Sequence, residues 1–296
     1  SNICKNKCKF CAFSREEGEN GAYQMSIKEI LEKASQIIQE KATELHIVGG
    51  LHPELGLDFY IDMISSIHKR FPEVHLQAFT AVEISHFAEI SGISTYETLK
   101  KLKDAGLGSL PGGGAEVFAT EIREELCPEK LSGEEWLNTM RIAHNLGLKS
   151  NATMLYGHIE QDKDRINHLL KLRELQDETG GFMTFIPLAF HPKNTDMKNI
   201  SSTAGILDLK MLAIGRLMLD NFDHIKAFWI MLGIKISQIS LSFGVDDIDG
   251  TVAEEKITHS AGAETPEALT VNEIRSLIEE TGREPVERDT LYNRIN

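Results

Sequence analysis

The sequence is short of basic residues, and this shortage narrows the classes of partner that the protein can have. Its 296 residues include 31 Lys+Arg against 45 Asp+Glu, which gives a net charge of 31 − 45 = −14 at pH 7. Binding to nucleic acid or to an anionic membrane surface needs basic patches, so this balance argues against both. No apolar run reaches the length of a membrane span and no signal peptide is visible, so we expect a cytoplasmic protein.

Several common motifs are missing as well. No G-x-G-x-x-G follows the first predicted strand, which argues against an open dinucleotide-binding sheet. The three glycines at 112–114 are not followed by G-K-[ST], which argues against a phosphate loop. No internal repeat, low-complexity tract or clear linker divides the chain. We therefore expect one domain over residues 1–296, with a helical C-terminal extension from about residue 252.

Cysteine is scarce but concentrated, because three of the four cysteines lie within the first eleven residues. Cys4, Cys8 and Cys11 follow the spacing C-x3-C-x2-C, with the aromatic Phe10 just before the last of them. Three such thiolates can hold a cubane [4Fe-4S] cluster and leave its fourth iron without a protein ligand, where chemistry can take place. A zinc site or a disulfide framework fits less well, since the usual second pair of zinc ligands is absent and the local count is odd. The fourth cysteine, Cys127, is expected to be a buried structural thiol.

Apolar periodicity predicts helices that alternate with short strands, which is typical of an α/β fold with a parallel sheet. The first helix is introduced by Ser26 and Glu29, which form a capping-box pattern. The predicted helices are 27–43, 57–71, 85–90, 94–105, 131–145, 162–179, 206–221 and 270–281, and the seven predicted strands are 44–48, 74–81, 107–110, 148–155, 182–190, 225–231 and 239–243.

Polar residues and glycines gather where the predicted strands end, which is the active edge of a parallel barrel. Gly49 and Gly50 follow the first strand, and glycines there let a backbone approach a ligand. Histidines at 52, 158 and 191 also follow strands, whereas those at 46, 75, 144 and 168 read as surface or edge residues. The acidic run at 246–249 reads as a solvated loop, with a divalent cation site as the weaker alternative.

The cysteine motif resembles that of the radical S-adenosylmethionine (SAM) enzymes, and the glycine pair after the next strand matches their glycine motif. This resemblance implies a TIM-like (β/α)8 barrel, a [4Fe-4S] cluster and cleavage of SAM to methionine and a 5′-deoxyadenosyl radical. In these enzymes the cysteine loop follows the first barrel strand. We therefore expect an N-terminally truncated chain that lacks strand 1.

Longer strings across residues 2–293 resemble the aminofutalosine synthase family within this superfamily. They include 48–53, 78–84, 109–116, 150–160, 175–182, 249–252 and 285–293. The resemblance implies addition of the deoxyadenosyl radical to 3-[(1-carboxyvinyl)oxy]benzoate, which gives 6-amino-6-deoxyfutalosine, methionine and bicarbonate on the route to menaquinone. SAM is then a substrate, and a flavodoxin or ferredoxin would supply the electron.

The resemblance also implies roles for particular residues, although it specifies no catalytic residue. Cys4, Cys8 and Cys11 would ligate the cluster, and Gly49 and Gly50 would contact the methionine end of SAM. The further assignments are Thr80, Glu83, Ser150 and Asn151 to the ribose and carboxylate of SAM, and Arg15, Tyr156, His158 and His191 to the substrate carboxylates.

The same sequence features are compatible with other functions. Two sister enzymes share several of the strings, namely cyclic dehypoxanthine futalosine synthase and the radical SAM half of the F420-precursor synthase. A non-catalytic iron–sulfur redox module would hold a stable cluster without cleaving SAM. A zinc-stabilised structural protein would bind zinc and show no visible absorption.

Overall fold

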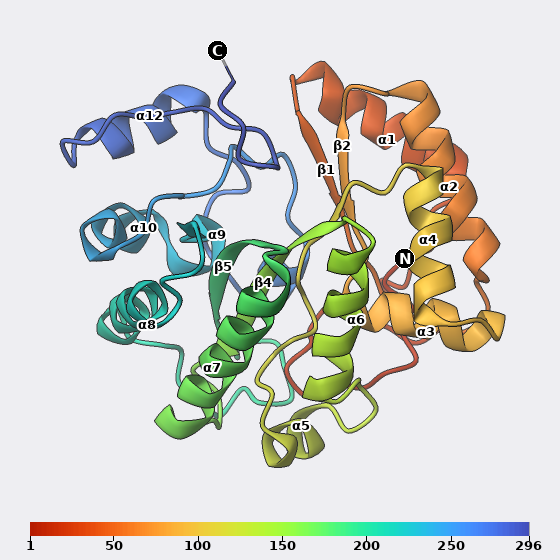
Figure 1. The fold of residues 1–296 in the computed structure, drawn as a ribbon, viewed down its shortest axis with the longest axis horizontal. Helices are drawn as coiled ribbons and strands as arrows, with labels where there is room; N and C mark the ends of the chain where they lie inside the picture. The colour runs from red at the N-terminus through yellow and green to blue at the C-terminus, as the bar shows by residue number, and fades with distance from the viewer. Residues whose placement is uncertain (296) are drawn as a thin grey trace.

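The computed structural model describes residues 1–295 and is built on a parallel sheet whose strands follow chain order (Figure 1). The six strands are β1 (Glu44–Ile47), β2 (His75–Ala78), β3 (Ser109–Leu110), β4 (Lys149–Tyr156), β5 (Phe182–Ala189) and β6 (His224–Ile225). Each strand pairs in parallel with the next. The predicted α/β class with a parallel sheet is therefore confirmed.

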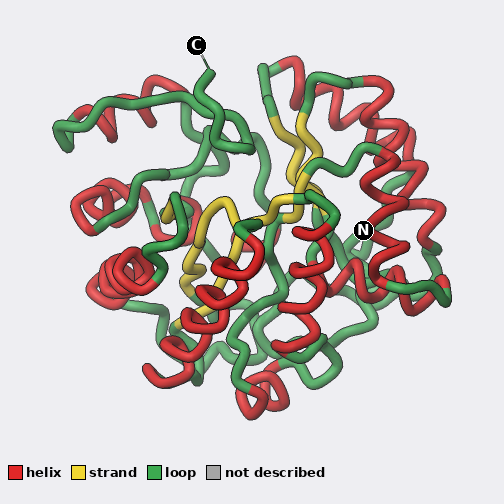
Figure 2. The backbone as a smooth tube through the Cα atoms, in the orientation of Figure 1, coloured by secondary structure: helices red, strands yellow, loops and turns green. Residues whose placement is uncertain are grey.

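The helices lie around the outer side of the strands (Figure 2). They are α1 (Ile27–Gln39), α2 (Leu57–Arg70), α3 (Ala81–Ser91), α4 (Thr95–Ala105), α5 (Thr120–Leu126), α6 (Gly133–Asn145), α7 (Asp162–Thr179), α8 (Gly205–Met218), α9 (Trp229–Leu232), α10 (Ile234–Ser240), α11 (Ile257–Ser260) and α12 (Val271–Glu279). The predicted capping box of Ser26 and Glu29 is present at α1, and the same Ser/Thr-x-x-Glu pattern caps α3, α4, α6 and α12.

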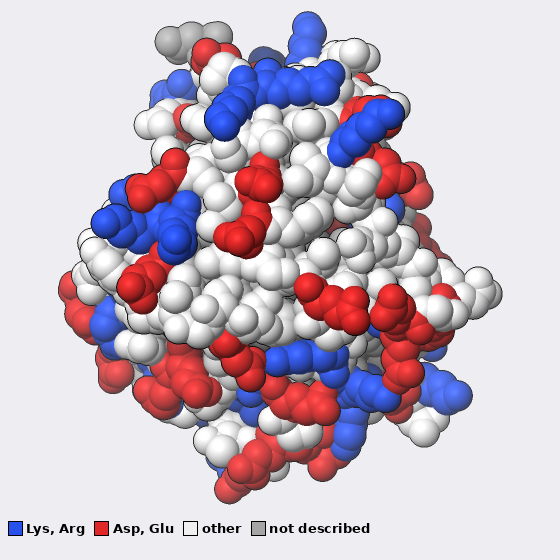
Figure 3. All heavy atoms as spheres, turned by 90° about the vertical axis from the view of Figure 1, so that its right-hand side faces the viewer, with Lys and Arg blue, Asp and Glu red and all other residues white. Residues whose placement is uncertain are grey.

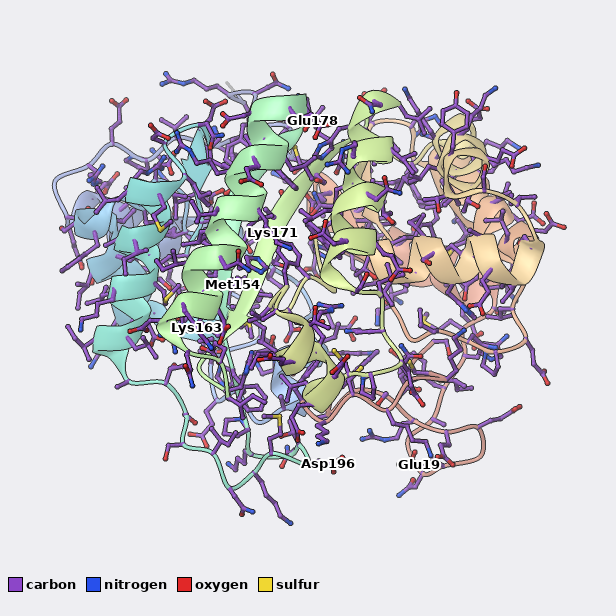
Figure 4. All side chains as sticks on the ribbon, turned by 60° about the horizontal axis from the view of Figure 1, so that its bottom comes forward. Glu19, Met154, Lys163, Lys171, Glu178 and Asp196 are labelled. Atoms are coloured by element: carbon purple, nitrogen blue, oxygen red, sulfur yellow. The ribbon has the colours of Figure 1, made fainter. Side chains whose placement is uncertain are left out.

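The two faces of β4 separate a helix side from an inner side, because successive side chains on a strand point in opposite directions. Ser150 and Tyr156 bond to His144 on α6 and to Asp208 on α8. Asn151 instead bonds to Gln77 on β2. In Figure 4, Met154 lies beneath α7, whose leucines share the main core cluster with it.

Two predicted strands near the C-terminus are wrong. Only Ile225 of the predicted strand 225–231 lies in β6, after which the chain turns into the short helix α9. The predicted strand 239–243 is the end of α10 and the 3-10 turn Leu241–Phe243. Short apolar runs fit a helix as well as a strand, and here Ile239 and Phe243 are 47% and 40% exposed. Asp247 instead forms a single isolated parallel bridge with Lys226, the residue after β6.

The C-terminal residues close the end of the sheet where β1 and β6 begin. Arg288 and the hydroxyl of Tyr292 both bond to Asp247, and the Tyr292 ring stacks on His224 with centroids 3.8 Å apart. The Thr290 hydroxyl donates to Glu44 at the start of β1. Asp247 is thus buried and ion-paired, so the expectation of a solvated loop is wrong for this residue.

Figure 3 shows one face of the molecule, where acidic and basic side chains are intermixed. Within residues 1–295, no helix is long and apolar enough to cross a membrane.

Gly112 is the glycine whose replacement should disturb the fold most clearly. Its φ is +81°, and a Cβ there would lie 2.2 Å from the Asn151 carbonyl oxygen on β4. We expect Gly112→Ala to lower the free energy of unfolding by about 3 kcal/mol or more, because left-handed strain and overpacking add. Gly282 has a similar φ of +77° but nothing within 4 Å, so it is the matched control. Gly282→Ala should cost only about 1–2 kcal/mol in urea unfolding. Equal losses for the two variants would refute the close contact with β4.

Candidate functional site

The cysteine loop has no regular secondary structure, and main-chain hydrogen bonds from four distant segments hold it at the carboxyl ends of the strands. The Cys4 N–H donates to the Arg15 carbonyl at 3.0 Å, and the Lys5 N–H donates to the Leu51 carbonyl at 2.9 Å. Lys9 uses both of its main-chain groups, since its N–H donates to Leu126 at 2.9 Å and its carbonyl accepts from Asp196 at 3.1 Å. In Figure 4, Asp196 and Glu19 mark this edge of the molecule, away from Glu178 near the end of α7.

The glycine pair after β1 packs directly against the first cysteine. A Cβ on Gly50 would lie 2.3 Å from the Ile3 carbonyl oxygen and 3.0 Å from the Cys4 Cβ. The Gly50 N–H donates to Ser1, and the Gly49 N–H donates to Glu83 Oε1 at 3.0 Å. Glycine is therefore required here so that the loop and the turn can lie in contact.

Glu83 joins this turn to the start of α3. Its second carboxylate oxygen accepts from the N–H and the hydroxyl of Thr80, at 2.8 and 2.9 Å. Burial raises the pKa of Glu83 to about 7, against the three hydrogen bonds that favour the charged form. The structure thus brings Cys4, Gly49, Gly50, Thr80 and Glu83 together in one connected group.

Apolar side chains surround the other two cysteines. Cys8 is buried and packs in a cluster with Leu155, Phe190, Met197 and Cys127, against which Phe10 and Cys11 also lie. Burial raises the pKa of the Cys8 thiol to about 12. Cys127 ends α5 and is 2% exposed, as expected for a structural thiol.

The thiols fit an iron–sulfur cluster better than a single metal ion. Cys4, Cys8 and Cys11 are all free, and Cys4 and Cys11 are only partly buried. Within residues 1–295, no three His, Cys, Asp or Glu side chains converge as one bound ion would require. A cubane offers a separate iron to each thiolate, whereas zinc gathers its ligands around one point.

The two residues predicted on β4 are not brought together. Asn151 faces the inner side, where its amide donates to Gln77 Oε1 at 3.3 Å. Ser150 is fully buried on the helix side, where its hydroxyl pairs with His144 Nε2 at 2.9 Å. Asn151 therefore stays a prediction for contact with SAM, while Ser150 lies on the opposite face of the strand.

The four residues predicted to bind carboxylates are already engaged within the protein. The Tyr156 hydroxyl donates to Asp208 at 2.7 Å, and the His191 Nε2 bonds to the Met231 carbonyl at 2.9 Å. The Nε2 of His158 bonds to the Leu155 carbonyl, and its Nδ1 accepts from the Ile159 N–H and lies near the Glu160 carboxylate. The His158 side chain is also fully buried.

Arg15, the last of these four residues, is partly exposed and keeps hydrogen-bond donors available for a ligand. Its Nη1 donates to the carbonyls of Ala12 and Ser14 at 2.9 and 2.7 Å, and its Nε lies 3.6 Å from Glu19. Its side chain remains 32% exposed.

Sequence reasoning missed three charged residues of this region, Glu116, Lys130 and Asp208. Lys130 Nζ donates to Glu116 Oε1 at 2.6 Å, and both side chains are mostly buried. Asp208 is buried on α8, where burial raises its pKa and the Tyr156 hydroxyl bonds to it. Glu116 could have been noticed in the sequence, because it closely follows the three glycines at 112–114. Its pairing with Lys130 could not, since the two residues are 14 positions apart.

Two family models match the chain in tandem. The model described as "Radical SAM superfamily" matches residues 1–172, and the model described as "CofH/MqnC C-terminal region" matches residues 179–296.

Curated relatives match over nearly the whole chain. The aminodeoxyfutalosine synthase of Thermus thermophilus is 46% identical, covering 100% of this chain and 80% of its own, and that of Streptomyces coelicolor is 45% identical, covering 99% and 78%. The 5-amino-6-(D-ribitylamino)uracil–L-tyrosine 4-hydroxyphenyl transferase of Methanococcoides burtonii is 40% identical, covering 100% and 84%.

Two solved structures share the fold of this chain. Methylornithine synthase aligns with a TM-score of 0.74 at 16% identity, covering 97% of this chain and 81% of its own. A maturase of the [FeFe]-hydrogenase aligns with a TM-score of 0.73 at 19% identity, covering 95% and 62%. These likenesses support the predicted TIM-like barrel fold, here present as an open sheet of six strands.

Replacement of the loop cysteines should remove iron selectively. We expect Cys4→Ala, Cys8→Ala and Cys11→Ala each to abolish iron and sulfide retention after anaerobic reconstitution, because each removes one thiolate ligand. Cys127→Ala is the matched control and should retain the full content and the visible absorption. Full retention in Cys11→Ala would contradict the ligand assignment.

His144 should make the fold sensitive to acid. It is buried rather than at the surface as predicted, and burial lowers its pKa to about 4. The pKa of His144 in the unfolded chain is about 6.5, so below this pH the unfolded chain binds a proton at His144 while the native state does not. The free energy of unfolding should therefore fall by on the order of 3 kcal/mol as the pH drops from about 6.5 to 4. Urea unfolding of His144→Asn should show a smaller loss over this range. The matched control is His68→Asn at an exposed position, which should show the same pH-dependent loss of stability as the wild type. If His144→Asn also shows the wild-type loss, His144 is not the group responsible.

Proposed function

The chain belongs to the radical SAM superfamily, and we propose on this premise that its reaction is that of an aminofutalosine synthase. Membership makes it an enzyme of radical, transferase-type chemistry that uses a [4Fe-4S] cluster and SAM. The proposed substrates are SAM, 3-[(1-carboxyvinyl)oxy]benzoate and one molecule of water, which hydrates the lost carboxyl group, and the products are 6-amino-6-deoxyfutalosine, methionine and bicarbonate. The observation that carries this choice is 46% identity to an aminodeoxyfutalosine synthase along the full length of the chain.

The bound cluster supplies the electron that cleaves SAM to methionine and the 5′-deoxyadenosyl radical. The protein's part is to hold the reactants and to exclude water. Cys4, Cys8 and Cys11 would present the cluster on the inner side of the sheet. Leu155, Phe190 and Met197 would form an apolar wall beside it, which suits a radical that must add to a double bond without meeting solvent.

The residues around the glycine turn are proposed to receive the methionine end of SAM. Glu83 and Ser1 accept from the N–H groups of Gly49 and Gly50, and the Gly50 carbonyl accepts from the His52 N–H, so a ligand would meet this turn mainly through the Gly49 carbonyl oxygen and Cα hydrogens. Asn151 on β4 would face the ribose. Thr80 and Glu83 would act by holding the turn in place, since their polar atoms bond to each other and to Gly49.

Arg15, His158 and His191 remain the proposed partners of the substrate carboxylates, whereas Tyr156 lies on the helix side of β4 as Ser150 does. Arg15 is favoured among them, because a guanidinium has five N–H donors and, within residues 1–295, the Arg15 Nη2 makes no hydrogen bond. A flavodoxin or ferredoxin is the proposed electron donor, and a cytoplasmic location is proposed with it.

A product analysis tests the proposal directly. The protein is reconstituted anaerobically and incubated with reductant, SAM and 3-[(1-carboxyvinyl)oxy]benzoate, and the products are identified by mass. We expect 6-amino-6-deoxyfutalosine, and SAM labelled in its adenosine should pass the label into this product. The Cys11→Ala variant is the matched control and should form none.

Two other outcomes would redirect the assignment. Free 5′-deoxyadenosine without an adduct would reject the addition reaction and favour a hydrogen-abstracting sister enzyme. A parallel reaction with L-tyrosine and 5-amino-6-(D-ribitylamino)uracil tests the activity named for the Methanococcoides burtonii relative. Product formation only in that reaction would refute aminofutalosine synthesis.

A further inference from the structure

Lys130 is a mostly buried cation that lies against the cysteine loop. Its Nζ donates to Glu116 Oε1 at 2.6 Å and lies 4.9 Å from the centroid of the Phe10 ring, between Cys8 and Cys11 in sequence. The side chains of Lys130 and Glu116 are 15% and 12% exposed.

The main chain fixes Lys130 relative to this loop. Its N–H donates to the Cys127 carbonyl at 2.9 Å, in the turn that follows α5. The same turn holds the loop itself, since the N–H of Lys7 donates to Glu129 Oε2 and the N–H of Lys9 donates to the Leu126 carbonyl, both at 2.9 Å. The turn 126–130 and the loop 6–9 therefore form one connected unit.

The lysines of the loop itself differ from Lys130 in exposure. The side chains of Lys5, Lys7 and Lys9 are 38%, 73% and 45% exposed, and each pairs with an exposed glutamate. Solvent and salt screen such surface charges, whereas a charge in the interior acts through a much lower effective dielectric constant. Among these four lysines, Lys130 should therefore act most strongly on the loop cysteines.

We propose that Lys130, fixed by Glu116 and Phe10, is the positive charge that sets the reduction potential of the cluster held by Cys4, Cys8 and Cys11. Burial alone would lower the pKa of Lys130, but Glu116 raises it above its ordinary value, so the charge is present throughout the working pH range. Lys130 is a positioning residue in this role, because it acts on the cluster through its field and not by contact with the substrate.

The physical effect is electrostatic. Reduction adds one electron from a low-potential one-electron donor to the cluster and its three thiolates, without a proton, and so makes a negative group more negative. A fixed cation nearby stabilises the reduced form, and hydrogen bonding, burial and net charge are the recognised means by which a protein shifts such potentials. Glu116 has the opposite sign and reduces the effect. Lys130 is the member of the pair whose charged end lies over Phe10 of the loop, so its effect should be the larger.

A redox titration of reconstituted protein tests the proposal without reference to product. The reduced cluster is followed by electron paramagnetic resonance while mediators set the potential. Lys130→Met should shift the midpoint potential to a more negative value, and Glu116→Gln should shift it to a more positive one. The double variant should lie between Lys130→Met and the wild type, and Lys130→Arg should restore most of the wild-type value.

Lys9→Met is the matched control, because it removes the same charge from the residue next to Cys8 at an exposed position. Its shift should be much smaller than that of Lys130→Met. Equal shifts in these two variants, or no shift in Lys130→Met, would overturn the proposal. If Lys130→Met fails to retain iron, Lys130→Gln takes its place, because it removes the same charge but keeps a polar end: a shift to a more negative potential supports the proposal, and an unchanged potential refutes it.

This inference rests on the cluster of the proposed function but not on its substrate. Failure of wild-type protein to retain iron would overturn both. A cluster whose potential responds to Lys130, in a protein that forms no 6-amino-6-deoxyfutalosine, would refute the proposed substrate and leave the role of Lys130 standing.

Discussion

The arrangement of the site depends on fixing the cysteine loop, residues 1–11, which has no regular secondary structure of its own. In helices and paired strands the main-chain N–H and C=O groups bond to one another in a regular pattern. The main-chain groups of this loop instead form hydrogen bonds with those of Arg15, Leu51, Leu126 and Asp196. Leu51, Leu126 and Asp196 come from segments that follow three different strands, so the loop can be placed only when the sheet has assembled. The need for contact also explains Gly50, where any side chain would displace Ile3 and Cys4. The glycine turn is thus a packing requirement of the cysteine loop before it is a contact for any ligand.

A second feature of the loop's surroundings is a mostly buried ion pair that lies against it. A buried ion pair costs desolvation energy that its attraction only partly offsets, so the Lys130–Glu116 pair is a poor source of stability. Its position beside Phe10 makes better sense as control of the local field. The contrast with the Arg288–Asp247 pair is informative, because that pair lies at the opposite end of the sheet and joins the C-terminal residues to the segment beside β6. The Arg288–Asp247 pair fixes where the C-terminal residues lie, whereas the Lys130–Glu116 pair lies against the cysteine loop.

Sequence patterns predicted the local parts of this structure better than the parts set by tertiary contact. The cysteine spacing, the capping box at Ser26 and the long helix α7 depend on residues a few positions apart, so they can be read directly. The short strand β6 and the helix α10 could not be separated by pattern, because runs such as 234–240 suit either structure until their neighbours are known. The pairing of Lys130 with Glu116, like that of Tyr156 with Asp208, joins separate elements and leaves no periodic signal.

Substrate choice must come from side chains beyond the features that the superfamily shares. Bacterial and archaeal relatives with different named activities are 46% and 40% identical along this chain, so the cluster loop and the fold do not separate them. A buried carboxylate needs a cation or several N–H donors, since an unpaired charge in an apolar site is very costly. Tyr156 and His158 would have to give up existing bonds to buried partners, whereas Arg15 would exchange only a 3.6 Å contact with the exposed Glu19. Selection for a dicarboxylate should therefore act first through Arg15 and through whichever side chains fix its direction.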